Sequence, residues 1–405
     1  MKTKLPSGEE LEFCLSEGEY RELAKKVREV RKLLESAALA EKAKVRVFVG
    51  GSFAKRTMLS TKQKEVDVFL MYSASYSESE ISRLHRKIVL RAFPKGEWKI
   101  EKIKGSRDYF QVARKDKREV VFEVVPTLGV RKPERARNVM DLSYFHVRYV
   151  LAHTDEKMRR EICLAKQFCK ANGFYGAESH VSGFSGYALE CLIIHYKSFE
   201  KMLRDFVRAK EKIVIDIEKH YASRNQVLQE MNASKIAGPV VLVDPTWKER
   251  NVLAALSKDT FEEFRKLARK FLRNPSRRFF EEKEFSLSEF AGFAKKGFEV
   301  VEVEIATKKK RKDIAAAKLK KFYKFLLRVL AKKYEIARSE FVQNGETGAN
   351  VYLALKPLEF VVVRGPLVKF QASVEKFKAK HAKTFLREGR VFARERFGRS
   401  VEEYL

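Results

Sequence analysis

The stretch that decides the fold reads GGSFAKRT over residues 50–57 and EVDVF over residues 65–69. Alternating valines at residues 45–49 predict a strand that runs directly into the two glycines. A strand, a Gly-Ser turn and a helix start leave backbone N–H groups available to hold phosphate oxygens. Glu65 and Asp67 are two residues apart in a second predicted strand, so their side chains project to the same face. The stretch therefore predicts a phosphate-binding turn beside two carboxylates.

Two carboxylates beside bound phosphates can hold Mg²⁺, which takes oxygen ligands from protein and substrate together. A third candidate ligand is Glu123, an acid inside the otherwise apolar run VVFEVVP at residues 120–126. Burying an unpaired carboxylate is costly, and a metal ion would relieve that cost. We therefore predict that Glu65, Asp67 and Glu123 are the catalytic, metal-binding residues of a two-metal site. Each feature alone would be a weak signal, and their order and spacing make the set specific.

The charge of the chain indicates a nucleic-acid partner. Its 405 residues contain 85 Lys and Arg against 54 Asp and Glu, a net charge of +31. A thermophile-like surface rich in Lys and Glu would explain many of these charges but not the imbalance, which favours a polyanion.

The cysteines and the N-terminus indicate the compartment. No CxxC pair or zinc-like spacing is formed by Cys14, Cys163, Cys169 and Cys191, so we expect reduced core thiols. The N-terminus shows no apolar signal region, and no apolar run is long enough to span a bilayer. We therefore expect a cytoplasmic protein.

Hydrophobic periodicity predicts a small mixed α/β domain, then a helical region, then a mixed last third. In the first part we expect helices over 20–42 and 81–88 and strands over 45–49, 66–71, 98–103, 109–114 and 119–125, with Pro126 ending the last strand. Next we expect helices over 142–153, 155–172, 185–207, 217–231 and 258–272, and a short apolar run at 240–243. The last third predicts strands over 299–305, 351–355, 360–363 and 390–394, a helix over 372–386, and a long helix after the basic run KKKRK at 308–312, with Leu319, Phe322, Leu326 and Val329 on its apolar face.

Taken together, the Gly-Ser turn and the three acids resemble the signature of the DNA-polymerase-β-like nucleotidyltransferase superfamily. This superfamily also contains poly(A) polymerases, oligoadenylate synthetases and antibiotic nucleotidyltransferases. The second region separates them, because it is similar to the neck of class I, archaeal-type CCA-adding enzymes. The similar blocks are FHVRYV at 145–150, FYGAE at 174–178, VSGFSGY at 181–187, LECLIIHYKSF at 189–199, and VDP at 243–245 leading to RNVLAA at 250–255. The resemblance is specific over roughly residues 20–260 and looser beyond.

The resemblance implies an α+β, multidomain fold in four parts. These are a nucleotidyltransferase head that forms the catalytic palm (1–141), a helical neck for nucleotide recognition (142–257), and an α/β body (258–365) and tail (366–405) that bind the acceptor stem and TΨC arm of tRNA. The implied activity is template-independent addition of CCA to the 3′ end of tRNA from CTP and ATP. The tRNA 3′-OH would attack the α-phosphate and pyrophosphate would leave. The implied cofactor is Mg²⁺, and a homodimer is plausible for the family.

Seven residues match nucleotide-binding positions of the family: Gly51, Ser52, Lys55, His146, Lys166, Tyr175 and Arg250. The resemblance implies that Ser52 and Lys55 contact the triphosphate. It places Tyr175 near the sugar and triphosphate, and it implies that Arg250 helps to read the base. Without the resemblance, His146 would be interpreted as a buried core histidine.

The chain departs from the family pattern at three points. Glu123 stands where the family has Asp, Lys55 stands where it has Arg, and the spacing from Ser52 to Glu65 is one residue longer. The extra methylene of Glu123 moves its carboxylate by about 1.5 Å, and a misplacement of about 1 Å can cost on the order of a hundredfold in rate. Two alternatives therefore remain open. One is an enzyme of partial activity that adds only A or only C, or acts as a poly(A)-type polymerase; the other is a tRNA-binding homologue with a weakened active site.

Overall fold

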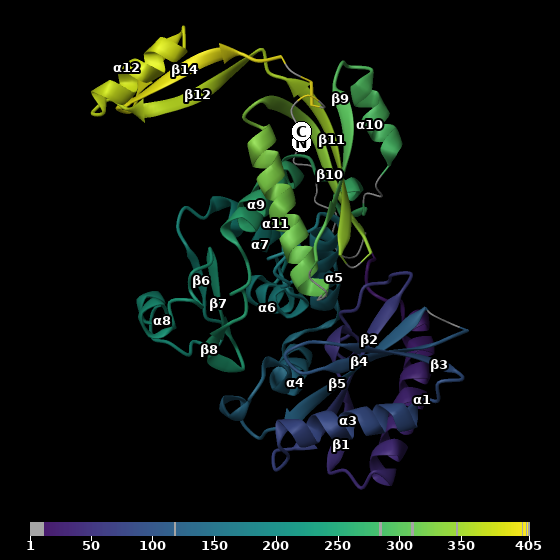
Figure 1. Cartoon of the computed structure of the whole chain (residues 1–405). Coiled ribbons are helices and arrows are strands. Elements are labelled where there is room, and N and C mark those ends of the chain that lie inside the picture. Colours follow the sequence, from purple (N-terminus) through teal and green to yellow (C-terminus); the bar gives the residue numbers. More distant parts are fainter. Residues whose placement is uncertain are drawn as a thin grey trace. The chain divides into compact units, whose positions relative to one another are not determined.

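The computed structural model describes residues 12–116, 119–282, 286–308, 312–345, 347–398, 400–401 and 403 (Figure 1). The chain divides into two compact units, the first formed by residues 1–177 and 181–282 and the second by residues 178–180 and 283–405. The fold is α+β and multidomain, which confirms the predicted class. The finer division into head, neck, body and tail stays a prediction. No helix within the described ranges is long and apolar enough to cross a membrane.

The first unit begins with a five-stranded sheet in the order β1-β2-β5-β4-β3. β2 and β5 run parallel, and the other neighbouring strands are antiparallel. The helices and strands predicted up to residue 125 are all confirmed. In chain order they are α1 (Glu17–Ala40), β1 (Val45–Val49), the short α2 (Gly51–Ala54), β2 (Lys64–Ser73), α3 (Glu78–Ala92), β3 (Trp98–Ile103), β4 (Tyr109–Arg114) and β5 (Val120–Gly129).

Helices α1 and α3 cover the sheet with their apolar stripes. Each begins at a capping box, formed by Ser16 with Glu19 and by Ser77 with Glu80, which satisfies backbone N–H groups of the first turn. Their buried residues join those of β1, β2 and β5 in one hydrophobic core. This core holds the strands that present the three predicted acids.

The prediction that Pro126 ends its strand is wrong. β5 continues to Gly129, and Pro126 pairs with Leu70 of the parallel neighbour β2. On the other side of β5, the pairing with β4 stops where Phe110 meets Val124. Proline removes one ladder hydrogen bond, which is tolerated where a strand has lost one of its neighbours.

The rest of the first unit is mainly helical. Its elements are 3₁₀ turns η1 (Pro133–Arg135), η2 (Val139–Leu142) and η3 (Arg277–Phe280), helices α4 (Ser143–His153), α5 (Glu156–Ala171), α6 (Gly186–Tyr196), α7 (Phe199–Arg208), α8 (Arg224–Glu230) and α9 (Lys258–Arg273), and strands β6 (Ile213–Ile215), β7 (Val240–Asp244) and β8 (Trp247–Asn251). A second hydrophobic core joins α5, α6, α7 and α9 through tightly packed phenylalanines such as Phe168, Phe199 and Phe264.

Two helix predictions in this region are corrected. The segment 185–207 forms two helices, because Lys197 adopts a left-handed conformation (φ 64°) and Ser198 then caps α7. The segment 217–231 contains only the short helix α8. Strand β6, which precedes it, pairs in parallel with β7 and was not predicted.

The second unit contains two three-stranded antiparallel sheets, ordered β10-β11-β9 and β12-β14-β13. Its elements are α10 (Leu287–Ala294), β9 (Glu299–Ala306), α11 (Lys312–Leu330), β10 (Tyr334–Asn344), β11 (Gly348–Pro357), β12 (Phe360–Leu367), α12 (Gln371–Lys380), β13 (Thr384–Arg387) and β14 (Arg390–Arg396). Of the basic run at 308–312, residues 309–311 lie outside the described residues.

Two predictions in the second unit are wrong, and helix α10 and strand β10 were not predicted. The helix predicted over 372–386 ends at Lys380, and β13 follows because it pairs along β14. On α11, Leu319 and Leu326 face the core as predicted, whereas Phe322 is 48 % exposed. Strand β10 lies beside β11 without having been predicted.

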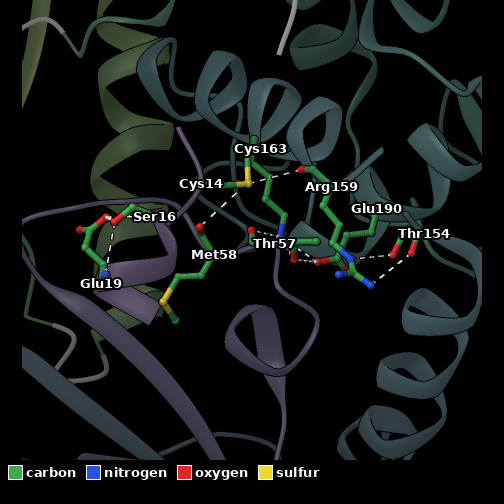
Figure 2. Close-up of a disulfide and its surroundings, with 10 residues drawn as sticks. Cys14, Ser16, Glu19, Thr57, Met58, Thr154, Arg159, Cys163 and Glu190 are labelled. Atoms are coloured by element: carbon green, nitrogen blue, oxygen red, sulfur yellow. Dashed lines mark hydrogen bonds and ion pairs between the residues drawn. A yellow bond between two sulfur atoms is a disulfide. The ribbon is translucent and has the colours of Figure 1, made fainter. Parts of the chain in front are cut away.

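The expectation of four reduced thiols is also wrong for two of them. Cys14 and Cys163 form a disulfide that joins the segment before α1 to helix α5 (Figure 2). Cys169 and Cys191 are buried free thiols, as expected. The sequence offered no spacing signal for the pair, because 149 residues separate the two cysteines.

Candidate active site

The Gly-Ser turn packs directly against the carboxylate of Asp67. The N–H of Gly50 donates to the carbonyl of Asp67 at 2.9 Å, which joins the end of β1 to β2. Gly51 has a φ of 60°, and a Cβ at this position would lie 1.7 Å from Oδ2 of Asp67. Glycine is therefore required at position 51 both for its backbone conformation and for the space that the carboxylate occupies.

The strand register brings the predicted acids together. Asp67 on β2 pairs with Glu123 on the parallel strand β5, and Glu65 lies two residues before Asp67 on the same face. On the other side of β5, Gln111 of β4 pairs with Glu123, and its Nε2 donates to Oε1 of Glu123 at 2.9 Å. The amide of Gln111 therefore restrains the side chain of Glu123.

These acids line one pocket of about 210 Å³ together with most of the predicted nucleotide-binding residues. Its walls are formed by Ser52, Lys55, Glu65, Asp67, Glu123, Lys166, Tyr175, Gly186, Tyr187 and Glu190. Residues from the sheet and from helices α5 and α6 thus converge on a single hollow within the first unit.

Two of the acids are held in an environment that disfavours their charge. Burial raises the pKa of Asp67 to about 6, although the nearby ammonium of Lys55 opposes the shift. Burial also raises the pKa of Glu123 to about 7; the hydrogen bond from Gln111 opposes this shift, and the charge of Asp67 adds to it. The protein alone leaves this carboxylate charge incompletely neutralised.

The donor set fits a hard divalent cation that binds together with a phosphorylated substrate. Within the described residues, no three His, Cys, Asp or Glu side chains are already gathered closely enough to form a metal site. Mg²⁺ does not need such a cage, since it is commonly bound by one or two carboxylates with waters and substrate phosphates. Glu65, Asp67 and Glu123 offer oxygen ligands in the same pocket as the basic residues.

Two lysines meet a buried carboxylate at the edge of this pocket. Lys55 donates to Oε2 of Glu190 at 2.5 Å, and Lys166 donates to Oε1 at 2.8 Å. The hydroxyl of Thr57 donates to Oε1 at 2.6 Å and accepts from Lys166 at 3.0 Å. Lys166 is 2 % exposed, so it does not belong to a solvated helix face.

Tyr175 reaches the pocket because Gly186 leaves room for it. A Cβ at position 186 would lie 2.7 Å from the phenolic oxygen of Tyr175. Tyr175 forms an isolated bridge with Phe184, which fixes its backbone next to the start of α6. Burial raises the pKa of the Tyr175 hydroxyl, so this group remains a neutral donor.

His146 and Arg250 lie in an adjoining cluster around Asp244, which is fully buried. Asp244 is 3.2 Å from Nε2 of His146 and accepts from Arg250 at 2.6 Å. It also accepts from the hydroxyl of Tyr187 at 3.2 Å, and the ring of Tyr187 stacks on His146 with centroids 3.8 Å apart. Because Tyr187 also lines the pocket, it connects this cluster to the acids and lysines.

Sequence reasoning missed several residues of the site: Thr57, Gln111, Tyr187, Glu190 and Asp244. One signal was available for Glu190, which stands inside the apolar helix segment 189–194 just as Glu123 stands inside an apolar strand. A buried acid in an apolar element indicates a compensating partner. The sequence does not reveal which partner, since 135 residues separate Glu190 from Lys55.

The fold of this chain is also found in a solved structure of another protein. A solved structure of Cid1, described as having RNA terminal uridylyl transferase activity, aligns with a TM-score of 0.52 at 11 % sequence identity, covering 68 % of this chain and 96 % of that one. A family model described as the second domain of tRNA nucleotidyltransferase matches residues 160–281.

The chain is similar to three archaeal proteins, each named CCA-adding enzyme. The protein of Nanoarchaeum equitans is 38 % identical over 216 residues, covering 53 % of this chain and 52 % of the relative. That of Methanocaldococcus jannaschii is 28 % identical over 366 residues, with coverage of 86 % and 77 %. That of Saccharolobus shibatae is 33 % identical over 232 residues, with coverage of 57 % and 52 %. The matches thus span about half the length of the first and third relatives. Residues 160–281 thus resemble the second domain of tRNA nucleotidyltransferase, and the chain is similar over part of its length to archaeal proteins named CCA-adding enzyme.

Proposed function

We propose that this protein adds CCA to the 3′ end of tRNA, using CTP and ATP and releasing pyrophosphate. The observation that supports this most directly is the pairing of Asp67 with Glu123 in one pocket with Ser52, Lys55 and Lys166. Such a pocket offers ligands for a cation and positive charge for a triphosphate. The family relationship supports tRNA as the acceptor.

We assign the metal-binding role to Glu65, Asp67 and Glu123, and Mg²⁺ is the proposed ion. When bound, it would promote ionisation of the attacking hydroxyl and neutralise the leaving pyrophosphate. The backbone of Gly51 and the hydroxyl of Ser52 would bind phosphate oxygens, and Lys55 would add a charge-assisted contact. Catalysis would rest mainly on positioning and charge neutralisation.

The cluster around Asp244 would select the base of the incoming nucleotide. C and A both present an exocyclic amino donor beside a ring acceptor, whereas U has a carbonyl in place of the amino group. Arg250 would supply the donor for the ring acceptor, and Asp244 holds the guanidinium in place. Because Asp244 already receives hydrogen bonds from Arg250, Tyr187 and Thr246, the acceptor for the amino group would come from tRNA phosphates. The nucleotide would lie next to His146, whose ring stacks on Tyr187, and next to Tyr175, which lines the pocket.

The second unit would bind the tRNA backbone. On α11, Lys318, Lys321, Phe322, Phe325 and Arg328 are all exposed and lie on one helix face. Basic side chains interleaved with aromatic rings suit nucleic acid, because the cations contact phosphates and the rings stack on bases or sugars. The acceptor stem and TΨC arm are the proposed target, and recognition would depend on the shape of the duplex.

The test is incubation of a tRNA that ends at its discriminator base with the protein, Mg²⁺ and labelled CTP or ATP. Incorporation of two C residues and one A residue supports the proposal. Incorporation of A alone, C alone or a run of A residues would instead establish one of the partial activities. Tight tRNA binding with no incorporation of label would indicate a tRNA-binding homologue with a weakened active site.

A further inference from the structure

Glu190 differs from the other acids of the pocket in having both of its oxygens engaged by the protein. Its side chain is fully buried on α6, between the apolar neighbours Leu189 and Cys191. Oε2 accepts from Lys55, and Oε1 accepts from both Thr57 and Lys166. These three hydrogen bonds occupy most of the about four lone-pair sites of a carboxylate, so we expect Glu190 to act through the side chains that it binds.

The two lysines are not equivalent in this arrangement. An ammonium group has three N–H donors. Lys166 uses all three, on Oε1 of Glu190, on the hydroxyl of Thr57 and on the carbonyl of Thr57 at 3.1 Å. Among the described residues, the hydrogen bond found for the ammonium of Lys55 is the one to Glu190. Two of its three N–H groups are therefore not used in that hydrogen bond. Lys55 is therefore the lysine with donors available to a ligand in the pocket.

We propose that Glu190 is a positioning residue, which fixes the ammonium of Lys55 at the nucleotide site. Lys166 and Thr57 in turn hold the carboxylate of Glu190 in place through their hydrogen bonds to it. Lys55 and Thr57 follow the short helix α2 beside the sheet, whereas Lys166 and Glu190 lie on helices α5 and α6. The buried carboxylate thus connects the Gly-Ser turn to helix α5 and to helix α6, which carries Tyr187.

The position of Lys55 explains why this matters. A flexible lysine is a point charge on a long stem, whereas the arginine that the family has here presents a rigid fork. Glu190 removes that freedom, because the 2.5 Å contact holds Nζ of Lys55 in one place. This inference rests on the proposed function, since it requires that the pocket bind a nucleoside triphosphate.

The experiment compares the wild-type protein, E190Q and the control D141N. Asp141 is an equally buried acid that binds Arg107 and the N–H groups of Leu128, Arg137 and Asn138, outside the pocket. For each variant we would measure kcat and KM for CTP and for ATP, the Kd for ATP in the absence of tRNA, and Tm. Glutamine keeps the size of the side chain but removes the charge that holds Lys55.

We expect E190Q to raise the Kd for ATP and the KM for both nucleotides by about tenfold or more, because CTP and ATP share the triphosphate. The preference for C and A over U and G should be unchanged. D141N should lower Tm while leaving Kd and KM within about twofold of wild type. A folded E190Q that binds ATP as wild type does would overturn the proposal.

Two further outcomes keep the inference separate from the proposed function. A wild-type protein that binds ATP but incorporates no label contradicts the proposed activity, and the Kd of E190Q still decides the role of Glu190. If E190Q does not fold, the variant E190D keeps the buried charge but withdraws the carboxylate from Nζ of Lys55 by about 1.5 Å. We expect E190D to bind ATP about threefold or more weakly than wild type, and wild-type affinity of a folded E190D would overturn the proposal.

Discussion

Asp67 and Glu123 occupy paired positions on the neighbouring parallel strands β2 and β5. The pairing places two carboxylates on one face although 55 residues of chain, including α3 and two further strands, lie between them. Gln111 then binds Glu123 from the opposite neighbour, β4. Glu123 therefore has Asp67 beside it on one neighbouring strand and the amide of Gln111 on the other.

Glu65→Gln and Asp67→Asn should each reduce nucleotide incorporation by about a thousandfold or more, because either change removes a charged oxygen ligand of the proposed metal site. Binding of tRNA, measured by filter retention or anisotropy, should remain within about threefold of wild type. Glu101→Gln on the exposed strand β3 is the matched control and should leave turnover unchanged. Normal turnover by either E65Q or D67N would contradict the metal assignment.

Glu123→Asp should reduce kcat by about tenfold to a hundredfold, even though the family has Asp here. The shorter side chain would withdraw its carboxylate by about 1.5 Å and lose the 2.9 Å hydrogen bond from Gln111. Single-turnover incorporation is the suitable measurement. Unchanged or faster turnover by E123D would show that this backbone is not adapted to Glu.

Gln111→Leu tests the same contact from the other side. Removing the amide should lower kcat in the wild-type background and have little further effect in E123D, because the contact is already lost there. Additive losses in the double variant would contradict the coupling of Gln111 to Glu123.

The cysteine pair gives a prediction about stability. Two thiols, those of Cys169 and Cys191, should titrate in the denatured, unreduced protein, although the sequence contains four cysteines. Reduction, or Cys14→Ser, should lower the unfolding free energy of the first unit by about 2–5 kcal/mol, because the disulfide closes a long loop. Reducing agent should not change the Tm of C14S any further. Four titratable thiols in the purified protein would contradict the assignment.

The charge of Glu190 predicts a pH-dependent contribution to stability. Burial alone would raise the pKa of Glu190, but the charges of Lys166 and Lys55 outweigh it and lower the pKa to about 2. A lowered pKa means that the ionised group stabilises the folded state above its unfolded value, near 4.5, and that this contribution is lost as the pH falls toward 2. The stability gap between wild type and E190Q should therefore be constant near pH 7 and shrink below about pH 4.5. A gap that widens in acid would contradict the ion pairing.

The exposed face of α11 predicts salt-dependent binding of tRNA. Each phosphate contact contributes about 0.7–0.9 to the slope of log affinity against log salt concentration. Lys318→Gln and Lys321→Gln together should reduce that slope by about 1–2. Lys95→Gln removes an exposed charge from the turn before β3 and should not change the slope. Equal slopes for wild type and the double variant would place the RNA contacts elsewhere.

The segment from α1 to β5 could be predicted from the sequence because its signals are local. Alternating valines and the pair Glu65 and Asp67 have a two-residue period, and Gly51 satisfies a backbone requirement that lies within the same turn. Predictions failed where long-range pairing decides the structure. Strand β13 forms because β14 lies beside it, and the periodicity of its own residues indicated a helix.

The sequence pointed to some of the residues that line the pocket but not to the contacts between them. Seven of its residues matched motif positions, yet none of them indicates that Glu190 binds Lys55 or that Asp244 binds Arg250. Both acids lie in apolar segments, so the cost of burying a carboxylate marks them as paired without identifying the partner. Contacts between residues far apart in the sequence can be identified only in the folded structure.

The most direct measurement is the sequence of the 3′ end that the protein makes on a tRNA ending at its discriminator base, with Mg²⁺ and all four nucleoside triphosphates present. We predict that C, C and A are added in that order and that extension then stops. We also predict that D67N adds nothing while still binding the tRNA. An unextended tRNA in the presence of wild-type protein, or a tail of any other composition, would contradict the central claim.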